Sequence, residues 1–215
     1  MSRLKKAAER AQQWLQNVNA EDSQYVAMSE IGLWFCERIY LDKSVLMEDK
    51  SRKVNLTSPI SLIEMDRKEI LALTKDISLS SQNILPDNIE GKQEWAQIFG
   101  GIALSFAHYG DISVVAALVR AAASLNLNGT LLLEAQDYLL DQQQPDGTFG
   151  LLDREVKQLQ SETKSNEDVR LGLTVEVLWA LAQVATQHFH NNYDQIRIIN
   201  RSASDLLMSE NHKVP

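Results

Sequence analysis

The sequence contains little cysteine, proline or glycine: its 215 residues include one Cys, four Pro and nine Gly. A lone cysteine excludes an intramolecular disulfide and a metal site built from several thiolates. We expect Cys36, in the apolar stretch LWFCERIY, to be a buried free thiol, because no histidine lies near it in sequence to activate it. The scarcity of glycine and proline argues against a sandwich or barrel of many short strands.

An excess of basic charge is also missing, since 21 Lys and Arg face 29 Asp and Glu for a net charge of −8. This balance disfavours nucleic acid and anionic membranes as electrostatic partners. The segment MSRLKKAAERAQQW lacks the apolar centre of a secretory signal, and no apolar run reaches the roughly 18 to 20 residues of a membrane span. We expect a cytoplasmic chain with no nucleic-acid partner and no membrane span.

Sequence signatures of common catalytic and metal sites are absent as well. The chain has no glycine-rich phosphate loop, nucleophile elbow, HExxH pair or EF-hand loop. His188 and His190 would point to different sides of a helix, whereas helical metal ligands are usually four residues apart. The sequence therefore predicts no metal site and no cofactor.

Helical periodicity is what the sequence does contain. In residues 2–18 the apolar positions recur at the i, i+3, i+4, i+7 spacing of one helix face. The regions between residues 42 and 59 and between 78 and 92 lack such a pattern and are interpreted as irregular links. Helices are predicted at residues 2–18, 23–41, 61–77, 94–109, 112–125, 131–143, 169–189 and 193–210.

Two of these helices, residues 112–125 and 169–189, are apolar nearly all round, which is typical of interior helices. The others are more one-sided, so an inner layer wrapped by an outer one is predicted. The fold class is all-α, with about eight helices in antiparallel hairpins, as a partial α/α-toroid or solenoid. The prediction is a single domain over 1–215, with sub-units 1–90 and 91–215 as the alternative.

Three glycines carry local predictions. Gly100 and Gly101 lie in mid-helix, where each costs up to about 1 kcal/mol relative to alanine. Close approach of another backbone is the expected compensation. Gly110 is predicted to follow one helix in the C′ position, and Asp111 to cap the next one.

The stretch QQQPDGTFG at residues 142–150 interrupts the helical pattern. Pro145 is expected to stop the preceding helix. Asp146 and Gly147 form a turn dipeptide, Phe149 can tuck under that turn, and a glutamine can bond turn carbonyls or a neighbouring helix. We interpret the stretch as a structural staple between two helices.

This stretch resembles the hairpin-turn motif of α/α-toroid proteins, which include squalene–hopene cyclases, related terpene cyclases and the β-subunits of protein prenyltransferases. The resemblance implies a staple between outer and inner helices. The catalytic Asp-rich motif and the zinc ligands of those families are absent, so it implies a fold and no activity. The residues that carry it are Tyr138, Leu139, Gln142, Gln144, Pro145, Asp146, Gly147, Phe149 and Gly150.

A second, shorter resemblance concerns YGDISVVAAL, which is similar to uncharacterised bacterial helical domains found beside genes for peptide or natural-product biosynthesis. It implies an accessory role in such biosynthesis. The predicted helices are fewer than those of a complete toroid, so a homo-oligomer or a partner protein would be needed to close the ring.

The candidate site residues are the polar and aromatic side chains of the central helices. Arg120 and Glu176 are isolated charges on very apolar helices, so each is expected to face either an ion-pair partner or a ligand. The predicted acid/base residues are His108, Asp111 and Glu176. The predicted ligand-binding residues are Arg120, Tyr109, Trp179 and Phe106.

Three functions follow from these patterns. The first is a non-catalytic binding or accessory protein that holds an apolar small molecule, a peptide or a protein partner. The second is a small lyase, cyclase or isomerase that uses the predicted acid/base residues. The third is a structural subunit of a larger assembly.

Overall fold

The computed structural model describes residues 2–18, 23–41, 59–80, 91–150 and 169–186. Within these ranges the protein is all-α and forms no β-strand, as the sequence predicts. The predicted helix at 193–210 and both histidines of the QHFH segment lie outside the described residues. The helices are α1 Arg3–Asn17, α2 Ser23–Leu41, the 3-10 helix η1 Pro59–Glu64, α3 Arg67–Ser80, α4 Lys92–His108, α5 Ile112–Ser124, α6 Thr130–Asp141, and Val169–Thr186.

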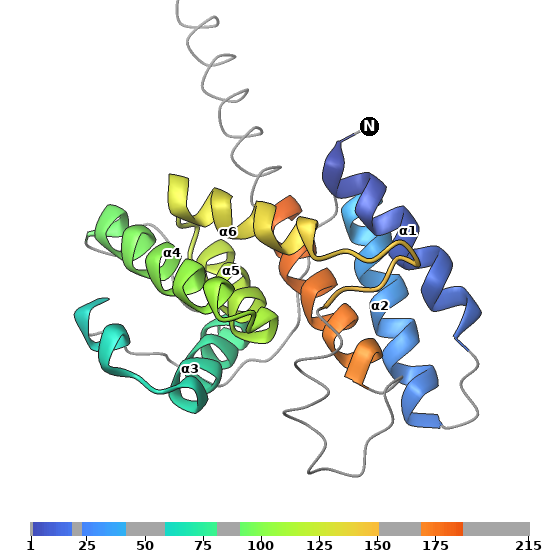
Figure 1. Ribbon diagram of the computed structural model, residues 1–215, viewed down its shortest axis with the longest axis horizontal. Coiled ribbons are helices and arrows are strands. Elements are labelled where there is room, and N and C mark those ends of the chain that lie inside the picture. Colours follow the sequence, from blue (N-terminus) through green and yellow to red (C-terminus); the bar gives the residue numbers. More distant parts are fainter. Residues whose placement is uncertain (1, 19–22, 42–58, 81–90, 151–168, 187–215) are drawn as a thin grey trace, which may run out of the picture.

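The helices form two groups joined by a central one (Figure 1). On one side α1 packs against α2, and on the other α3 and α4 pack against α5 while α6 packs against α4 and α5. The last described helix, Val169–Thr186, lies between the groups, and we call it the central helix (orange in Figure 1). The described parts before and after residue 90 are in contact, because α3 packs on α5.

The inner and outer layers predicted from hydropathy are present. Every residue of α5 except Ser113 is buried, and the central helix buries most of its residues. By contrast, α1 buries one face only, through Ala7, Ala8, Ala11 and Leu15. Burial of apolar surface on this scale is the main stabilising term of a helical domain.

The central helix meets α2 along a close, apolar contact. Phe35 of α2 stacks on Trp179 with ring centroids 5.7 Å apart and planes 13° from parallel. Leu15 of α1 and Val175 of the central helix both close in on Gly32 of α2, where an added Cβ would lie 2.8 Å and 3.2 Å from them. These contacts fix the central helix against the α1–α2 pair.

The apolar central helix also bears on the expectation that nothing in the chain could span a membrane. Val169–Thr186 is long and apolar enough to do so by length and composition, with a mean hydropathy of 1.3. In the structure 67% of the helix is buried inside the protein. Packing against α2 and α5 is the role observed for it.

The predicted helix at 61–77 is wrong in one respect, because the structure divides it into η1 and α3. Asp66 accepts hydrogen bonds from the backbone N–H groups of Lys68 and Glu69, at 2.7 and 2.9 Å. The Glu69 side chain in turn accepts one from the backbone N–H of Asp66 at 2.8 Å. This reciprocal capping box starts a new helix at Arg67.

The junction between α4 and α5 follows its prediction. Gly110 has φ +74°, the left-handed conformation of a C′ glycine, and Asp111 caps α5 by accepting from the backbone N–H of Val114. The two mid-helix glycines differ from each other. A Cβ on Gly100 would lie 2.6 Å from Leu131 Cβ, as the predicted close approach requires, whereas a Cβ on Gly101 would meet nothing within 4 Å.

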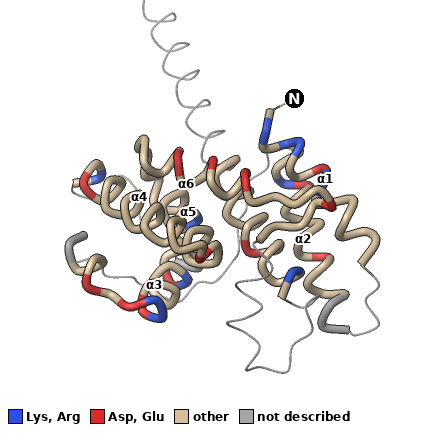
Figure 2. The backbone as a smooth tube through the Cα atoms, viewed as in Figure 1, with Lys and Arg blue, Asp and Glu red and all other residues tan. Residues whose placement is uncertain are grey.

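Charged residues are sparse in the interior and gather at helix ends and outer faces (Figure 2). The basic start of α1 is one such place. Arg3 donates to Asp137 at 2.9 Å and also pairs with Asp141, both on α6. Because all three side chains are exposed, these pairs are worth at most about 1 kcal/mol each and mainly orient α1 over α6.

Candidate functional site

Residues 142–150 form a compact loop that reaches from α6 to α1 (Figure 1). The helix α6 ends at Asp141, and Pro145 occupies the second position of a turn closed by the bond from Gly147 N–H to the Gln144 carbonyl at 3.0 Å. Proline is favoured there because its φ is already near the required value. Gln142 is the C-cap of α6, three residues before Pro145.

Glutamine amides hold this loop together and tie it to α1. The amide of Gln144 donates to the Gly150 carbonyl at 2.8 Å. The amide of Gln143 donates to the Gly147 carbonyl at 3.1 Å and to the carbonyl of Ala7 in α1 at 2.8 Å. Gly147, at φ +98°, lies so close to α1 that an added Cβ would come within 2.2 Å of the Arg10 carbonyl oxygen.

The other side of the loop is fixed to the central helix. The N–H of Phe149, whose ring is buried, donates to Thr174 Oγ1 at 3.1 Å, and Arg170 forms an ion pair with Asp146. Desolvation raises the pKa of Asp146, but the hydrogen bonds from Thr148 and the charge of Arg170 outweigh it, so the pKa is lowered. The loop thus connects α1 to the central helix and offers no reactive group.

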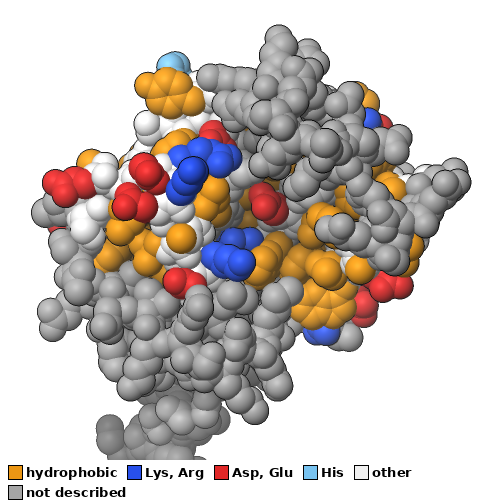
Figure 3. Space-filling view, turned by 90° about the horizontal axis from the view of Figure 1, so that it is seen from below, with side chains coloured by type: hydrophobic (Ala, Val, Ile, Leu, Met, Phe, Trp, Pro, Cys, Tyr) orange, Lys and Arg blue, Asp and Glu red, His pale blue; other side chains and the backbone are white. Residues whose placement is uncertain are grey.

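A group of polar and aromatic side chains lies where α5 meets α3 and the central helix. We call this group of side chains the Arg120–Glu176 site; its members are Ser78, Ser113, Arg120, Glu176 and Trp179. Figure 3 shows that, on the face seen from below, basic, acidic and hydrophobic side chains meet near the middle.

Arg120 is nearly enclosed, with 7% of its surface exposed. Its guanidinium lies over the Trp179 ring, 3.9 Å from the centroid, and its Nε donates to Ser78 Oγ at 3.1 Å. Burial lowers the pKa of Arg120 to about 10, and attraction to Glu176 opposes this shift, so the side chain stays charged at neutral pH. The stacking and the bond to Ser78 fix the plane of the guanidinium.

The terminal nitrogens of Arg120 are not used within the described part of the chain. Neither Nη1 nor Nη2 of Arg120 donates a hydrogen bond to another described residue. A carboxylate is the group that this free edge of a guanidinium binds best, through two parallel hydrogen bonds.

Glu176 faces the same place from the central helix. Enclosure by surrounding protein raises its pKa, and the charge of Arg120 and a hydrogen bond from Ser113 oppose that rise without cancelling it. The residue nevertheless retains exposed surface. Glu176 is thus an exposed carboxylate with a raised pKa and a buried arginine as its charge partner, a combination that is frequent at functional sites.

Asp111, a predicted acid/base residue, forms an ion pair with Arg67 and caps a helix. Arg67 of α3 binds it with both ends of its guanidinium, Nε to Oδ2 at 2.6 Å and Nη2 to Oδ1 at 3.2 Å. Because Asp111 also caps α5, it serves as a structural anchor. Its charge still reaches Glu176, whose pKa it helps to raise.

The remaining predicted residues do not join the site. His108 and Tyr109 are both exposed at the end of α4, with rings packed edge to face 5.5 Å apart. No hydrogen bond or ion pair in the described ranges connects His108 to Asp111 or Glu176. Phe106 is half-buried and packs against the core.

Sequence reasoning missed Ser78 and Arg67, which come from α3. Nothing in the sequence marks them, because their partners on α5 are more than 40 residues away. The sequence does indicate Ser113 as a neighbour of Arg120. The two residues are seven positions apart, and two helical turns place both on one face of α5.

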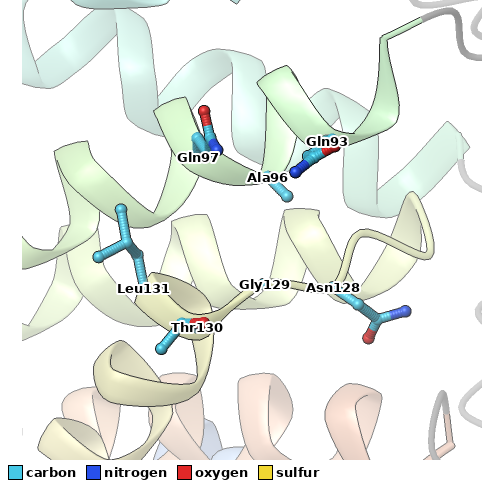
Figure 4. A pocket seen from close by; sticks show the side chains of 7 residues that line it. All are labelled: Gln93, Ala96, Gln97, Asn128, Gly129, Thr130 and Leu131. Atoms are coloured by element: carbon cyan, nitrogen blue, oxygen red, sulfur yellow. The ribbon is translucent and has the colours of Figure 1, made fainter.

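A separate pocket of about 370 Å³ lies between α4 and the start of α6 (Figure 4). Its polar lining is neutral and comes from Gln93, Gln97, Asn128 and Thr130. None of the predicted catalytic or ligand-binding residues lines it. With no charged or titratable side chain, this pocket offers hydrogen bonds and no acid/base chemistry.

A comparison with protein-family models finds no match, and searches of curated proteins and of solved structures find no similar protein either. The function is therefore inferred from the residues alone.

Proposed function

We propose that this chain is a non-catalytic binding protein that holds an apolar or peptidic ligand by a carboxylate at the Arg120–Glu176 site. The observation that supports it most directly is the free edge of the Arg120 guanidinium. An arginine nine-tenths buried normally has partners for its donors, because a buried unpaired charge is costly. Within the described residues, Arg120 instead presents two terminal nitrogens without a hydrogen bond beside a half-buried tryptophan.

The arrangement is preorganised for binding. The Trp179 ring is in contact with both Phe35 and the Arg120 guanidinium. Its role is to hold the guanidinium in place, together with Ser78. A receptor fixed before the ligand arrives loses less entropy on binding.

An architecture of α/α-toroid type, completed by a second copy or a partner protein, remains part of this proposal. It is supported by the loop at residues 142–150, which joins an outer helix, α1, to the buried central helix. The accessory role in peptide or natural-product biosynthesis rests on the sequence resemblance alone, and a cytoplasmic location remains a prediction from the sequence.

Isothermal titration calorimetry with 3-phenylpropionate, an apolar carboxylate, tests the binding function. Saturable binding is expected for the native chain, and Arg120→Met should remove it because methionine fills the space without donors. Arg3→Met is the matched control, since Arg3 is exposed and distant in the fold. Trp179→Leu, which leaves Arg120 in place but unsupported, should weaken binding even if Arg120→Met fails to fold.

Two results would overturn the proposal. One is unchanged affinity in a folded Arg120→Met variant. The other is conversion of a bound carboxylate by the purified chain, which would favour the second candidate, an acid/base enzyme. That candidate is supported by the raised pKa of Glu176, which suits a general acid or base. Glu176→Gln would then abolish turnover.

A further inference from the structure

Arg120 and Glu176 have opposite charges and influence each other's pKa, yet no direct ion pair joins them within the described structure. Arg120 bonds to Ser78 and stacks on Trp179, while Glu176 interacts with Ser113. A buried arginine would be expected to pair directly with a neighbouring carboxylate if the purpose of the two charges were to stabilise the fold. Neither charge is neutralised by a direct bond to the other within the described residues, so both can act on a ligand.

The chemistry of that group follows from the two charges that face it. Arg120 offers N–H donors to an anion, and Glu176 offers carboxylate oxygens to a cation. A ligand with two acidic groups would bring the second one against Glu176. A ligand with two amines would bring one of them against Arg120 or Arg67, whose charges both act on Glu176.

We infer that the Arg120–Glu176 site takes a zwitterionic ligand whose carboxylate and ammonium are close together, as in an α-amino acid. The carboxylate binds the free edge of Arg120, and the ammonium binds Glu176. This inference rests on the proposed binding function and adds the second anchor. A neutral zwitterion also suits a chain with a net charge of −8, because it gains no general repulsion.

A proton is linked to binding in this arrangement. The charged and hydrogen-bonding groups that act on Glu176 are Arg120, Ser113, Arg67 and Asp111. In the free protein enclosure favours the protonated form of Glu176, and a ligand ammonium favours the ionised form. Binding at weakly acidic pH should therefore release a proton, which a merely structural Glu176 would not do.

The experiment compares three probes that share one apolar body: L-phenylalanine, 3-phenylpropionate, which lacks the amine, and 2-phenylethylamine, which lacks the carboxylate. Calorimetry of the full chain should show the tightest binding for phenylalanine. Loss of either charged group should weaken the affinity about tenfold or more, the usual effect of losing a charge-assisted hydrogen bond. Titration in buffers of different ionisation enthalpy measures the released proton.

Glu176→Gln is the decisive variant, with Glu134→Gln, on the exposed face of α6, as the control. It should reduce the preference for phenylalanine over 3-phenylpropionate and abolish proton release, while 3-phenylpropionate still binds. If the native chain binds 3-phenylpropionate as tightly as phenylalanine, the zwitterion inference is wrong and the carboxylate-binding function stands. If none of the three probes binds, both are wrong.

Discussion

The side-chain amide of Gln143 donates a hydrogen bond to the backbone carbonyl of Ala7, 136 residues earlier, across 2.8 Å. The same amide donates to the carbonyl of Gly147, so a single side chain bonds both the turn inside the loop and the helix α1. Gln143→Ala removes both bonds. We expect it to lower the free energy of unfolding by about 1–3 kcal/mol, because part-buried polar groups lose their partner.

Chemical denaturation monitored by circular dichroism measures this loss. Gln16→Ala is the control, since Gln16 is exposed on α1 and its replacement should change stability by no more than about 0.5 kcal/mol. Equal stability of the two variants would show that the contact with Ala7 contributes nothing.

Gly147→Ala should be the most damaging small substitution in the loop. Gly147 has φ +98°, and an added Cβ would lie 2.2 Å from the Arg10 carbonyl oxygen, a backbone atom that cannot turn aside. Strain and displacement of α1 together should cost about 3 kcal/mol or more. Gly129→Ala makes the same chemical change at an extended residue with ordinary contacts, and thermal unfolding should distinguish them clearly.

The adjacent glycines of α4 provide an internally matched pair. Gly100→Ala would push a methyl group to 2.6 Å from Leu131 Cβ and 2.9 Å from the backbone of α6, so the variant should be destabilised by about 1–3 kcal/mol. Gly101→Ala points into open space and should be stabilising by up to about 1 kcal/mol through helix propensity. Opposite shifts in Tm are expected, and shifts of the same sign would contradict the packing of α4 on α6.

Asp146 gives the protein a defined response to acid. Its pKa is lower in the folded state than in the unfolded state, so the folded chain holds this proton less tightly. The stabilisation is therefore fully present above the unfolded pKa of an aspartate and is lost as pH falls through the lowered one. Asp146→Asn should flatten the acid limb of stability against pH.

Asp146→Ala separates the two contributions of this side chain. Asparagine can still accept the N–H of Thr148, whereas alanine cannot, so the alanine variant should also be less stable at neutral pH, by about 1 kcal/mol. Denaturation curves across the acid range provide both readings, and an unaltered acid limb in Asp146→Asn would contradict the role of the Arg170–Asp146 pair.

Cys36 should be inert in the native protein. It is 1% exposed, and burial raises the pKa of its thiol to about 12, so almost no reactive thiolate forms at neutral pH. Ellman's reagent should react fully only after unfolding in denaturant. Rapid reaction of the native chain would show that the contact between α2 and the central helix opens easily.

Sequence patterns predicted most helix positions because local signals determined them. Asp111 caps α5 as expected, and the apolar character of α5 and of the central helix gave their burial correctly. The break before Arg67 was missed although Asp66 and Glu69 carry a capping-box pattern, since apolar periodicity continues across it.

The site was less predictable than the fold. Arg120 and Glu176 were identified because an isolated charge on an apolar helix needs an ion-pair partner or a ligand. Their relation to Ser78 and Trp179 depends on how α3, α5 and the central helix are rotated against one another, and local sequence does not encode that rotation. For the same reason Asp111 was expected to be reactive, when its contact with Arg67 makes it structural.

The position of the central helix has a consequence for how the chain is made. The α1–α2 pair emerges from the ribosome before the other described helices, yet Phe35 receives its stacking partner, Trp179, only when the end of the described chain has been synthesised. The loop at residues 142–150 likewise awaits Thr174. Until then the nascent chain carries uncovered apolar surface, so a chaperone is expected to bind it, and release should follow translation of the central helix.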